Sequence, residues 1–202
     1  MNSANAKVAL VTGATRGVGK GVAVGLAAAG FSVYATGRSA AQTDLGRGIV
    51  PVSCDSTDAV AIARVFGRIE AERGRLDVLV NSAWGGYERM VEDGQFTWPA
   101  PFWLQPLWRW EAMVAVGVRG AFVASQHAAR LMVPARQGLI VHLSSWAARS
   151  TSAMSRTALQ RRRPTSWRPT WRTSSSLMAS LLCQCTQVLS EPRRCWPQVS
   201  SI

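Results

Sequence analysis

The sequence, which has 202 residues, lacks three features that define large classes of proteins. No window holds the roughly 18 to 20 unbroken apolar residues that a membrane-spanning helix needs. The first residues, Met1 to Lys7, are mostly polar and lead directly into an apolar run, which does not fit a secretory leader. Cysteines are few, and Cys54 lies far from Cys183, Cys185 and Cys195, so a disulfide scaffold is not expected. We therefore expect a cytoplasmic protein with one packed core and no membrane partner.

Acidic residues are also scarce, since 11 Asp and Glu stand against 23 Lys and Arg. Most of the imbalance lies in residues 150–202, which hold eight arginines and a single acidic residue, Glu191. A tail this basic ordinarily indicates binding to nucleic acid or to an anionic surface.

Short apolar runs alternate with helical patterns over the first 149 residues. Five runs predict buried strands: Val8–Thr12, Ser32–Thr36, Ile49–Ser53, Leu76–Val80 and Leu139–Leu143. Three segments between them predict helices: Val18–Ala29, Asp58–Arg73 and Trp110–Val133. Pro134 is expected to stop the third helix. This alternation predicts a doubly wound α/β domain over residues 1–149, with a parallel sheet that ends at the fifth strand.

A glycine-rich segment follows the first strand directly and opens the first helix. The glycines allow a tight turn and a close backbone approach to a pyrophosphate, while the helix N-terminus offers free N–H groups and its positive dipole. A glycine cluster alone is weak evidence, but its place between a strand and a helix indicates a dinucleotide site. The residues that we assign to the cofactor here are Thr12, Gly13, Thr15, Arg16, Gly17, Val18 and Gly19.

The spacing TGxxxGxG in this segment resembles the short-chain dehydrogenase/reductase family. Three more segments are similar to that family at matching places: Cys54-Asp55, Asn81-Ser82-Ala83 and Gly138–Ser145. The resemblance implies a Rossmann fold and hydride transfer between NAD(P) and a small carbonyl or alcohol substrate. It places Asp55 beside the adenine, Asn81 and Ala83 at the cofactor, and Ser145, or else Ser144, at the substrate oxygen. It also implies a homo-oligomer.

Two positions depart from the family pattern before the expected proton donor is reached. Trp84 stands where the family's NNAG motif ends in glycine. Gly117-Val118-Arg119-Gly120 stands where many members carry an Asn that helps to hold a proton-relay water. The absence of that Asn departs from the usual four-residue site, although some branches of the family resemble this chain at that place.

The family's proton donor is absent from the sequence. The resemblance implies a Tyr about a dozen residues after the catalytic Ser, and a Lys four residues later that lowers its pKa. The only tyrosines are Tyr34 and Tyr87, and the only lysines are Lys7 and Lys20. We therefore predict that this chain lacks normal catalysis, because a serine alone cannot supply the proton.

A shift of the reading frame explains both the missing residues and the basic tail. The sequence after Arg149 shows neither strand nor helix periodicity. Read one base out of frame with suitable synonymous codons, Arg156–Thr173 encodes YGVAKAATDKLAADMAH, which contains the family's YxxxK. Cys185–Arg193 can similarly give YPGLVRTE, which resembles the turn after the family's sixth strand. We infer a slip near Arg149–Thr151, so that residues 150–202 form a frameshifted, disordered tail.

Charge at the end of the second predicted strand favours NADP(H) as the cofactor. A carboxylate there would bind the ribose 2′-OH of NAD and repel a 2′-phosphate. This chain instead has Arg38 after that strand and Arg16 in the glycine-rich segment, and guanidinium groups match phosphate geometry. The alternative is two solvated arginines and NAD(H).

Other features carry weaker expectations. Gln95–Trp110, rich in Trp, Phe and Pro, predicts a loop that walls an apolar pocket or a subunit contact rather than one that touches a membrane. His142 is expected to be packed on its strand, and Cys54 to be a small core residue. His127 has no partner at metal-binding spacing, so no metal site is predicted.

Two other functions remain as alternatives to the oxidoreductase. The first is a regulatory protein that binds the dinucleotide without turnover. The second is a non-enzymatic protein whose interleaved Arg and Trp residues bind nucleic acid or anionic lipid. The frameshift disfavours the second, so no nucleic-acid partner is expected.

Overall fold

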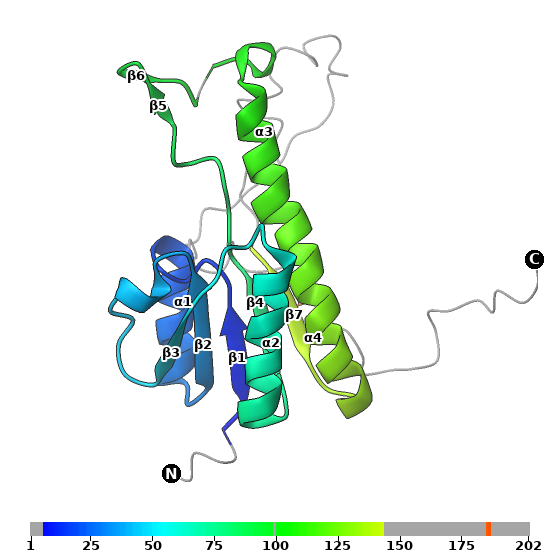
Figure 1. Cartoon of the computed structure of the whole chain (residues 1–202). Helices are drawn as coiled ribbons and strands as arrows, with labels where there is room; N and C mark the ends of the chain where they lie inside the picture. Colours follow the sequence, from blue (N-terminus) through cyan, green and yellow to red (C-terminus); the bar gives the residue numbers. More distant parts are fainter. Residues whose placement is uncertain (1–5, 99, 144–184, 187–202) are drawn as a thin grey trace, which may run out of the picture.

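A parallel β-sheet forms the centre of the protein, and helices cover both of its faces (Figure 1). The structure is a computed structural model that describes residues 6–98, 100–143 and 185–186. The strand order is β3-β2-β1-β4-β7-β8, and all pairs from β3 to β7 are parallel. The predicted doubly wound α/β fold is therefore confirmed.

All five predicted strands are present, with ends that differ by at most two residues. Their bounds are β1 (Val8–Val11), β2 (Ser32–Gly37), β3 (Ile49–Ser53), β4 (Val78–Asn81) and β7 (Leu139–His142). The central strand β1 is buried along its whole length. Its sequence is therefore continuously apolar, as expected of a strand covered on both faces.

The parallel part of the sheet ends at its fifth strand, β7, as predicted, and one further strand of two residues lies beside it. β8 (Cys185–Thr186) pairs antiparallel with β7, with Cys185 opposite Val141. Two residues carry no periodicity, so no sequence pattern could have indicated this strand. The predicted boundary at residue 149 and the rest of the predicted tail lie outside the described residues.

The first two helices match their predicted ranges within one residue. α1 (Gly17–Ala28) starts inside the glycine-rich segment. α2 (Ala59–Arg73) starts after Asp58, whose carboxylate accepts hydrogen bonds from the N–H groups of Val60 and Ala61. This side-chain cap satisfies two donors that a helix start leaves free, and so fixes where α2 begins.

The third helix is longer than predicted, and proline does not stop it. α3 (Leu107–Met113), a π-helical turn (Val114–Gly120) and α4 (Ala121–Ala135) follow one another without a break, as the long green rod of Figure 1 shows. Pro134 lies inside the last turn of α4. A proline at this place removes only one donor, and the helix ends at Arg136, which adopts a left-handed φ of 51°.

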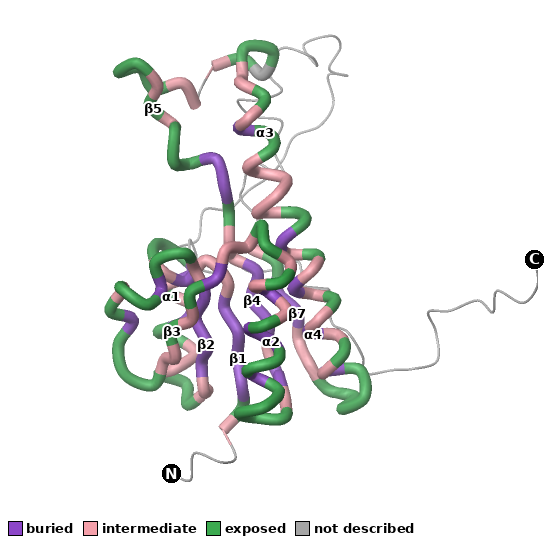
Figure 2. The backbone as a smooth tube through the Cα atoms, viewed as in Figure 1, coloured by how far each residue is buried: buried purple, intermediate pink, exposed green. Residues whose placement is uncertain are grey.

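Alternate residues of β1 belong to two apolar cores on opposite faces of the sheet. Val8 and Leu10 pack with side chains of α2 and α4, while Ala9 and Val11 pack with those of α1. Figure 2 shows the buried residues concentrated along these central strands. The two cores fix the sheet between its helices, and so fix the edge where the strands end.

A lobe projects beyond the carboxyl ends of the strands (Figure 1). It contains an antiparallel hairpin of β5 (Val91–Glu92) and β6 (Gln95–Phe96), a 3-10 turn (Phe102–Leu104) and α3. The sequence predicts a loop over residues 95–110. The prediction is wrong at both ends of this range, where the structure has the strand β6 and the start of the helix α3. Such short elements depend on the packing around them, and the pattern of the chain does not reveal them.

The guanidinium of Arg109 holds the lobe together, although an arginine is rarely buried. Arg109 is 1% exposed. It donates hydrogen bonds to the carbonyl of Arg89 (3.1 Å) and to Oγ1 of Thr97 (2.7 Å), and lies over the rings of Trp98 and Trp108. These two tryptophans therefore pack against a cation, which the sequence analysis did not anticipate.

The described helices include none with the length and apolar character that crossing a membrane requires.

Asp77 joins three strands at the opposite edge of the sheet, and only 6% of it is exposed. Its Oδ2 accepts the N–H of Val8 at 2.7 Å and Nε of Arg75 at 3.0 Å. Its backbone N–H donates to the carbonyl of Val8, and its carbonyl accepts the N–H of Leu139, both at 2.9 Å. This one residue therefore ties the start of β1 to the starts of β4 and β7.

We expect Asp77→Ala to lower the free energy of unfolding by about 2–4 kcal/mol, because the N–H of Val8 would stay buried without its acceptor. Asp77→Asn keeps one oxygen and should lose less. Urea unfolding measures both variants, with Glu70→Ala on the exposed side of α2 as the control. A loss for Asp77→Ala no larger than that of the control would contradict this role.

Candidate functional site

A large cleft lies where the parallel strands end, and most of the predicted cofactor residues line it. Its volume is about 1020 Å³, which is enough for a dinucleotide. The predicted residues along its wall are Gly13, Thr15, Arg16, Gly17, Val18, Gly19, Arg38, Asp55 and Ala83. The cleft thus combines segments that are far apart in the sequence, as expected at the carboxyl edge of a doubly wound sheet.

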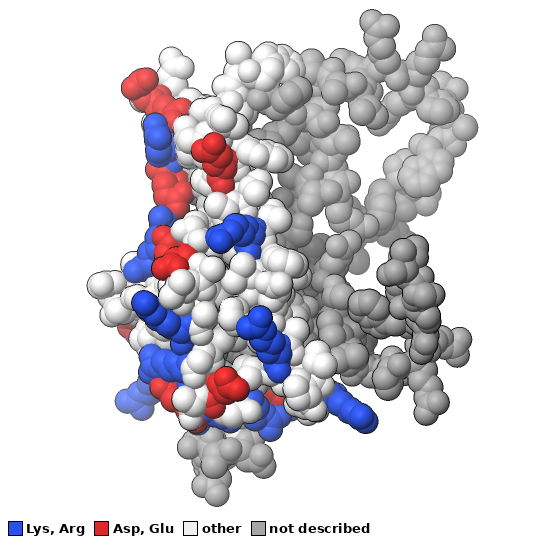
Figure 3. Space-filling model, turned by 45° about the vertical axis from the view of Figure 1, so that its right-hand side comes forward, with Lys and Arg blue, Asp and Glu red and all other residues white. Residues whose placement is uncertain are grey.

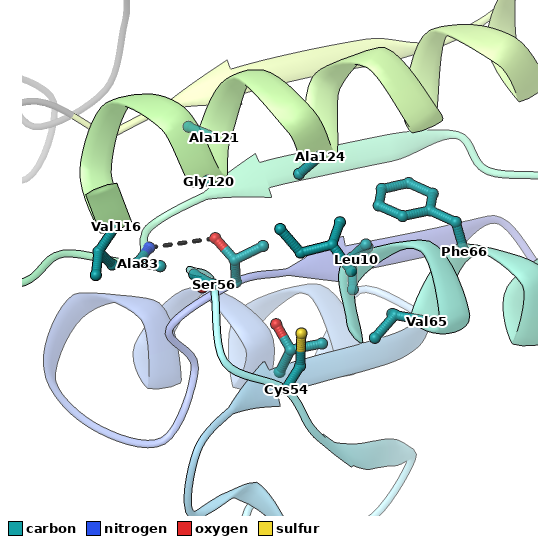
Figure 4. A pocket seen from close by; sticks show the side chains of 13 residues that line it. Leu10, Cys54, Ser56, Val65, Phe66, Ala83, Val116, Gly120, Ala121 and Ala124 are labelled. Atoms are coloured by element: carbon teal, nitrogen blue, oxygen red, sulfur yellow. Dashed lines mark hydrogen bonds between the residues drawn. The ribbon is translucent and has the colours of Figure 1, made fainter. Parts of the chain in front are cut away.

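Two predicted residues lie beneath the cleft and position its wall. The N–H of Thr12 donates to the carbonyl of Val80, and its Oγ1 accepts the N–H groups of Ser82 (3.1 Å) and Ala83 (3.2 Å; Figure 4). Asn81 is buried, and its Nδ2 donates to Oγ of Ser125 at 3.2 Å. Thr12 therefore fastens the glycine-rich segment to the end of β4, and Asn81 fastens that end to α4.

The glycine-rich segment approaches the end of β4 so closely that a side chain cannot fit between them. A Cβ at Gly13, whose φ is +64°, would lie 2.6 Å from Cα of Ala83 and 2.8 Å from its N. On the other side of the segment, a Cβ at Gly37 would lie 2.6 Å from Cγ2 of Thr15. Glycine at position 13 is required both by this contact and by its left-handed backbone.

The start of α1 leaves backbone donors available to an anion. Its cap residue, Arg16, makes no side-chain hydrogen bond to the helix, and its first turn contains no acidic residue. The first N–H groups of a helix have no partner inside the helix, and the helix dipole favours negative charge there. These features fit a pyrophosphate, as the sequence predicts.

A small apolar cavity lies below the cleft, between β1 and the helices α2 and α4 (Figure 4). Leu10, Phe66 and Ala124 line it together with Cys54. Burial, followed by the charges of nearby Asp55 and Asp58, raises the pKa of the Cys54 thiol to about 11. Cys54 therefore stays protonated at neutral pH, and its prediction as a small core residue is confirmed.

Asp55 is held as a carboxylate at the mouth of the cleft. Its Oδ1 accepts hydrogen bonds from both the N–H and the hydroxyl of Thr57, each at 2.8 Å. The backbone hydrogen bond is the main reason why the pKa of Asp55 lies below its usual value, and the nearby Arg38 adds to this. A charged Asp55 can accept a hydrogen bond from a bound base.

Arg38, the predicted ligand of a 2′-phosphate, lines this end of the cleft opposite Glu88. Its Nη2 donates to Oε1 of Glu88 at 2.5 Å, and 64% of the Arg38 side chain is exposed. Glu88 is a site residue that the sequence analysis missed. The two residues are 50 positions apart, and no local pattern connects them.

The two departures from the family pattern meet at the other end of the cleft. The indole of Trp84 lies on the backbone of Gly117 in the π-helical turn, where a Cβ would be 2.6 Å from Cε3 of the ring. Met113, Val116 and Leu143 line the cleft beside them and make this end apolar. Trp84 and Gly117 therefore depend on each other, which their joint departure from the pattern could have indicated.

Neither tyrosine takes the place of the missing proton donor. Tyr34 is fully buried and its hydroxyl donates to Oε2 of Glu72 at 2.6 Å, while burial raises its pKa. Tyr87 lines the cleft but lies next to Trp98, with ring centres 5.4 Å apart. Ser144 and Ser145 lie outside the described residues, so their role at the substrate stays a prediction.

The two histidines differ in their surroundings. The sequence predicts that His142 is packed, but it is exposed, because it is the last residue of β7. Its Nδ1 lies 3.4 Å from Nδ2 of Asn81. His127 stacks on Phe66. Over the described ranges, no group of three or more His, Cys, Asp or Glu side chains is placed to hold a metal ion.

Comparisons with known proteins agree with this geometry. The sequence model of the family described as short chain dehydrogenase matches residues 7–157. "Dehydrogenase/reductase SDR family member 1" of Homo sapiens is 42% identical over 150 residues, covering 70% of this chain and 47% of the relative. "D-threitol dehydrogenase" of Mycolicibacterium smegmatis is 34% identical over 153 residues, covering 70% and 54%. The chain thus spans about half the length of these curated relatives.

Solved structures show the same fold. A metagenomic short-chain oxidoreductase in complex with NADP superposes with a TM-score of 0.62 at 29% identity, covering 75% of this chain and 68% of that one. The closed form of serine dehydrogenase complexed with NADP+ has a TM-score of 0.60 at 25% identity, covering 72% and 57%.

The fold is therefore a Rossmann fold, of the kind that binds a nicotinamide dinucleotide. Its carboxyl edge brings together the glycine-rich segment, Asp55 and Ala83, which the sequence carries in three separate motifs. Both the site and the match across residues 7–157 show that the chain belongs to the short-chain dehydrogenase/reductase family of oxidoreductases.

Proposed function

We propose that this sequence derives from an NADP(H)-dependent oxidoreductase of small carbonyl or alcohol substrates, and that the chain as printed binds the cofactor without normal turnover. The observation that carries this proposal is the close packing of Gly13, just before α1, against the end of β4. This contact lies at the edge of a cleft of about 1020 Å³. When bound, the nicotinamide supplies the hydride.

The cleft residues have separate roles in this proposal. The backbone N–H groups at the start of α1 bind the pyrophosphate. Asp55 accepts a hydrogen bond from the adenine, and Ala83 forms the wall behind the cofactor. At the apolar end, Trp84 and Val116 exclude water from the nicotinamide and the substrate. Ser145, or Ser144, would bind the substrate oxygen.

The preference for NADP(H) rests on the charges at the end of β2. Arg38 and Arg16 line the cleft there, and no carboxylate occurs between Thr36 and Ser39 to bind a ribose 2′-OH. A guanidinium binds phosphate with parallel hydrogen bonds, so these residues favour the 2′-phosphate. NAD(H) remains the alternative if both side chains stay in solvent.

The absence of normal turnover rests on the missing Tyr and Lys. The family model matches residues 7–157, and neither a Tyr nor a Lys follows Tyr87 in the sequence. We propose that residues 1–149 form the nucleotide-binding domain and that residues 150–202 are read in the wrong frame. The second candidate function, a protein that senses the dinucleotide without turnover, would use the same cleft.

The partners that we propose are a small-molecule substrate and a second copy of the chain. On the face shown in Figure 3, the basic and acidic side chains of the described residues are interleaved rather than gathered into one basic patch. Leu107, Trp110, Val118 and Phe122 expose apolar side chains along the long helix. Burying them against another copy is the simplest explanation of their exposure. A cytoplasmic location is part of the same proposal.

Gly13→Ala tests the cofactor seat. We expect it to weaken NADPH binding at least about 10-fold and to lower stability by about 1–3 kcal/mol, because the new Cβ meets the backbone of Ala83 and strains a left-handed residue. Gly21→Ala in α1, where a Cβ meets nothing within 4 Å, is the matched control and should keep or raise stability. NADPH fluorescence titration and thermal melts measure both. Equal affinities for Gly13→Ala and the control would exclude this binding mode.

Arg38→Ser tests the preference for the 2′-phosphate. We expect NADPH to bind about 10-fold more weakly while the affinity for NADH changes by less than about 3-fold, since only NADPH carries the group that Arg38 contacts. Arg64→Ser, which removes an exposed charge from α2, is the control. If NADPH and NADH lose affinity equally, Arg38 does not select the cofactor.

Restoring the reading frame tests the absence of normal turnover. The printed chain should bind NADPH but not consume it with carbonyl substrates. A version corrected by one base near codons 149–151, which gains the YxxxK motif, should turn over. The same corrected chain with Phe encoded at the new tyrosine controls for folding and should lose turnover. Rates for the printed chain that match the corrected one would overturn the proposal.

A further inference from the structure

An ion pair connects the two walls of the cleft at the cofactor's adenosine end. Arg38 follows β2, whereas Glu88 lies on the segment between β4 and the hairpin. Both residues line the cleft, and Nη2 of Arg38 donates to Oε1 of Glu88 at 2.5 Å. The guanidinium that faces a 2′-phosphate is therefore already engaged by a carboxylate of the chain itself.

Glu88 is the fixed partner of this pair. Its Oε2 accepts the N–H of Gly86 at 3.0 Å. Gly86 has a φ of +91° and packs against α3, where a Cβ would lie 3.1 Å from Cγ of Met113. Burial acts to raise the pKa of Glu88, but backbone N–H groups and Arg38 outweigh it, so the pKa lies below its usual value. Glu88 is thus charged at neutral pH.

The segment is also held immediately after Glu88. The buried guanidinium of Arg109 donates to the carbonyl of Arg89 at 3.1 Å. The guanidinium of Arg89 in turn lies 4.6 Å from the ring centre of Trp108. With Gly86 held on one side and Arg89 on the other, the Glu88 carboxylate has a fixed place at the mouth of the cleft.

Arg38 is the partner that is free to move. Its side chain is 64% exposed, compared with 38% for that of Glu88. It also lies close enough to Asp55 to lower that residue's pKa, so its charge is shared between two carboxylates. An exposed ion pair is weak, and a doubly charged phosphate competes well with one carboxylate for a guanidinium.

We propose that Glu88 is a specificity-determining residue that competes with the 2′-phosphate of the cofactor for Arg38, and so limits the preference for NADP(H) over NAD(H). In the free cleft Glu88 holds Arg38 in place. On binding, the phosphate takes over the guanidinium, and the ion pair between Arg38 and Glu88 is lost. This inference rests on the proposed cofactor function and concerns the same cleft.

The test uses the full-length chain and two nucleotide fragments that differ only in the 2′-phosphate. Titration calorimetry measures the Kd of 2′,5′-ADP and of 5′-AMP for the wild type, Glu88→Gln, Arg38→Ala and the double variant. Asp93→Asn, which removes an equal charge from the exposed hairpin turn outside the cleft, is the matched control. Thermal melts establish that each variant is folded.

We expect Glu88→Gln to tighten the binding of 2′,5′-ADP about 3- to 10-fold, while 5′-AMP changes less than about 2-fold. The gain in affinity should vanish in the Arg38→Ala background, because Glu88 then has no guanidinium to bind in competition with the phosphate. Asp93→Asn should leave both affinities unchanged, which separates a local effect from a change in net charge.

Two kinds of failure are distinguishable. If the wild type binds both fragments but Glu88→Gln leaves the affinity for 2′,5′-ADP unchanged or weakens it, competition by Glu88 is wrong and the proposed function stands. A gain that persists without Arg38, or that Asp93→Asn reproduces, overturns the competition in the same way. If the wild type binds neither fragment, the proposed function fails, and this inference fails with it.

Discussion

The close approach of two backbones, at Gly13 and Ala83, is the constraint on which the rest of the site depends. A Cβ at Gly13 would lie 2.6 Å from Cα of Ala83, and Oγ1 of Thr12 accepts the N–H groups of Ser82 and Ala83 just beside this contact. The turn after β1 is thereby seated on the end of β4. This contact orients the start of α1 toward the cleft and leaves its N–H groups available to an anion.

The opposite end of the cleft depends on a contact of another kind. Trp84 lies on Gly117 in the π-helical turn between α3 and α4, and this pair stands where the family has a small residue and a polar one. A π-helical turn is a common feature of functional sites. The same long helix carries Arg109, whose guanidinium holds the projecting lobe in place. Helix, lobe and cleft wall are therefore one packed unit.

Most of the fold and much of the lining of the cleft could be predicted from the sequence. β1 is a continuous apolar run because both faces of the sheet are covered, and Asp58 caps α2 with its own carboxylate. Local signals failed where packing decides: Pro134 lies within α4, and the hairpin and β8 are too short to carry a period. The exposure of His142 follows from its place at the end of β7, which a burial pattern does not resolve.

By itself, the sequence determined the order of strands and helices, the place of the glycine-rich segment and the loss of the family's Tyr and Lys, because each is a property of local pattern or composition. Only the tertiary structure decided which residues meet. Arg38 and Glu88 are 50 positions apart in the sequence. They meet because β2 and β4 both pair with β1, so that the segments that follow these strands leave the sheet at the same edge. The pairing of Trp84 with Gly117 likewise arises because the end of β4 lies against the π-helical turn, and no local sequence pattern connects the two residues.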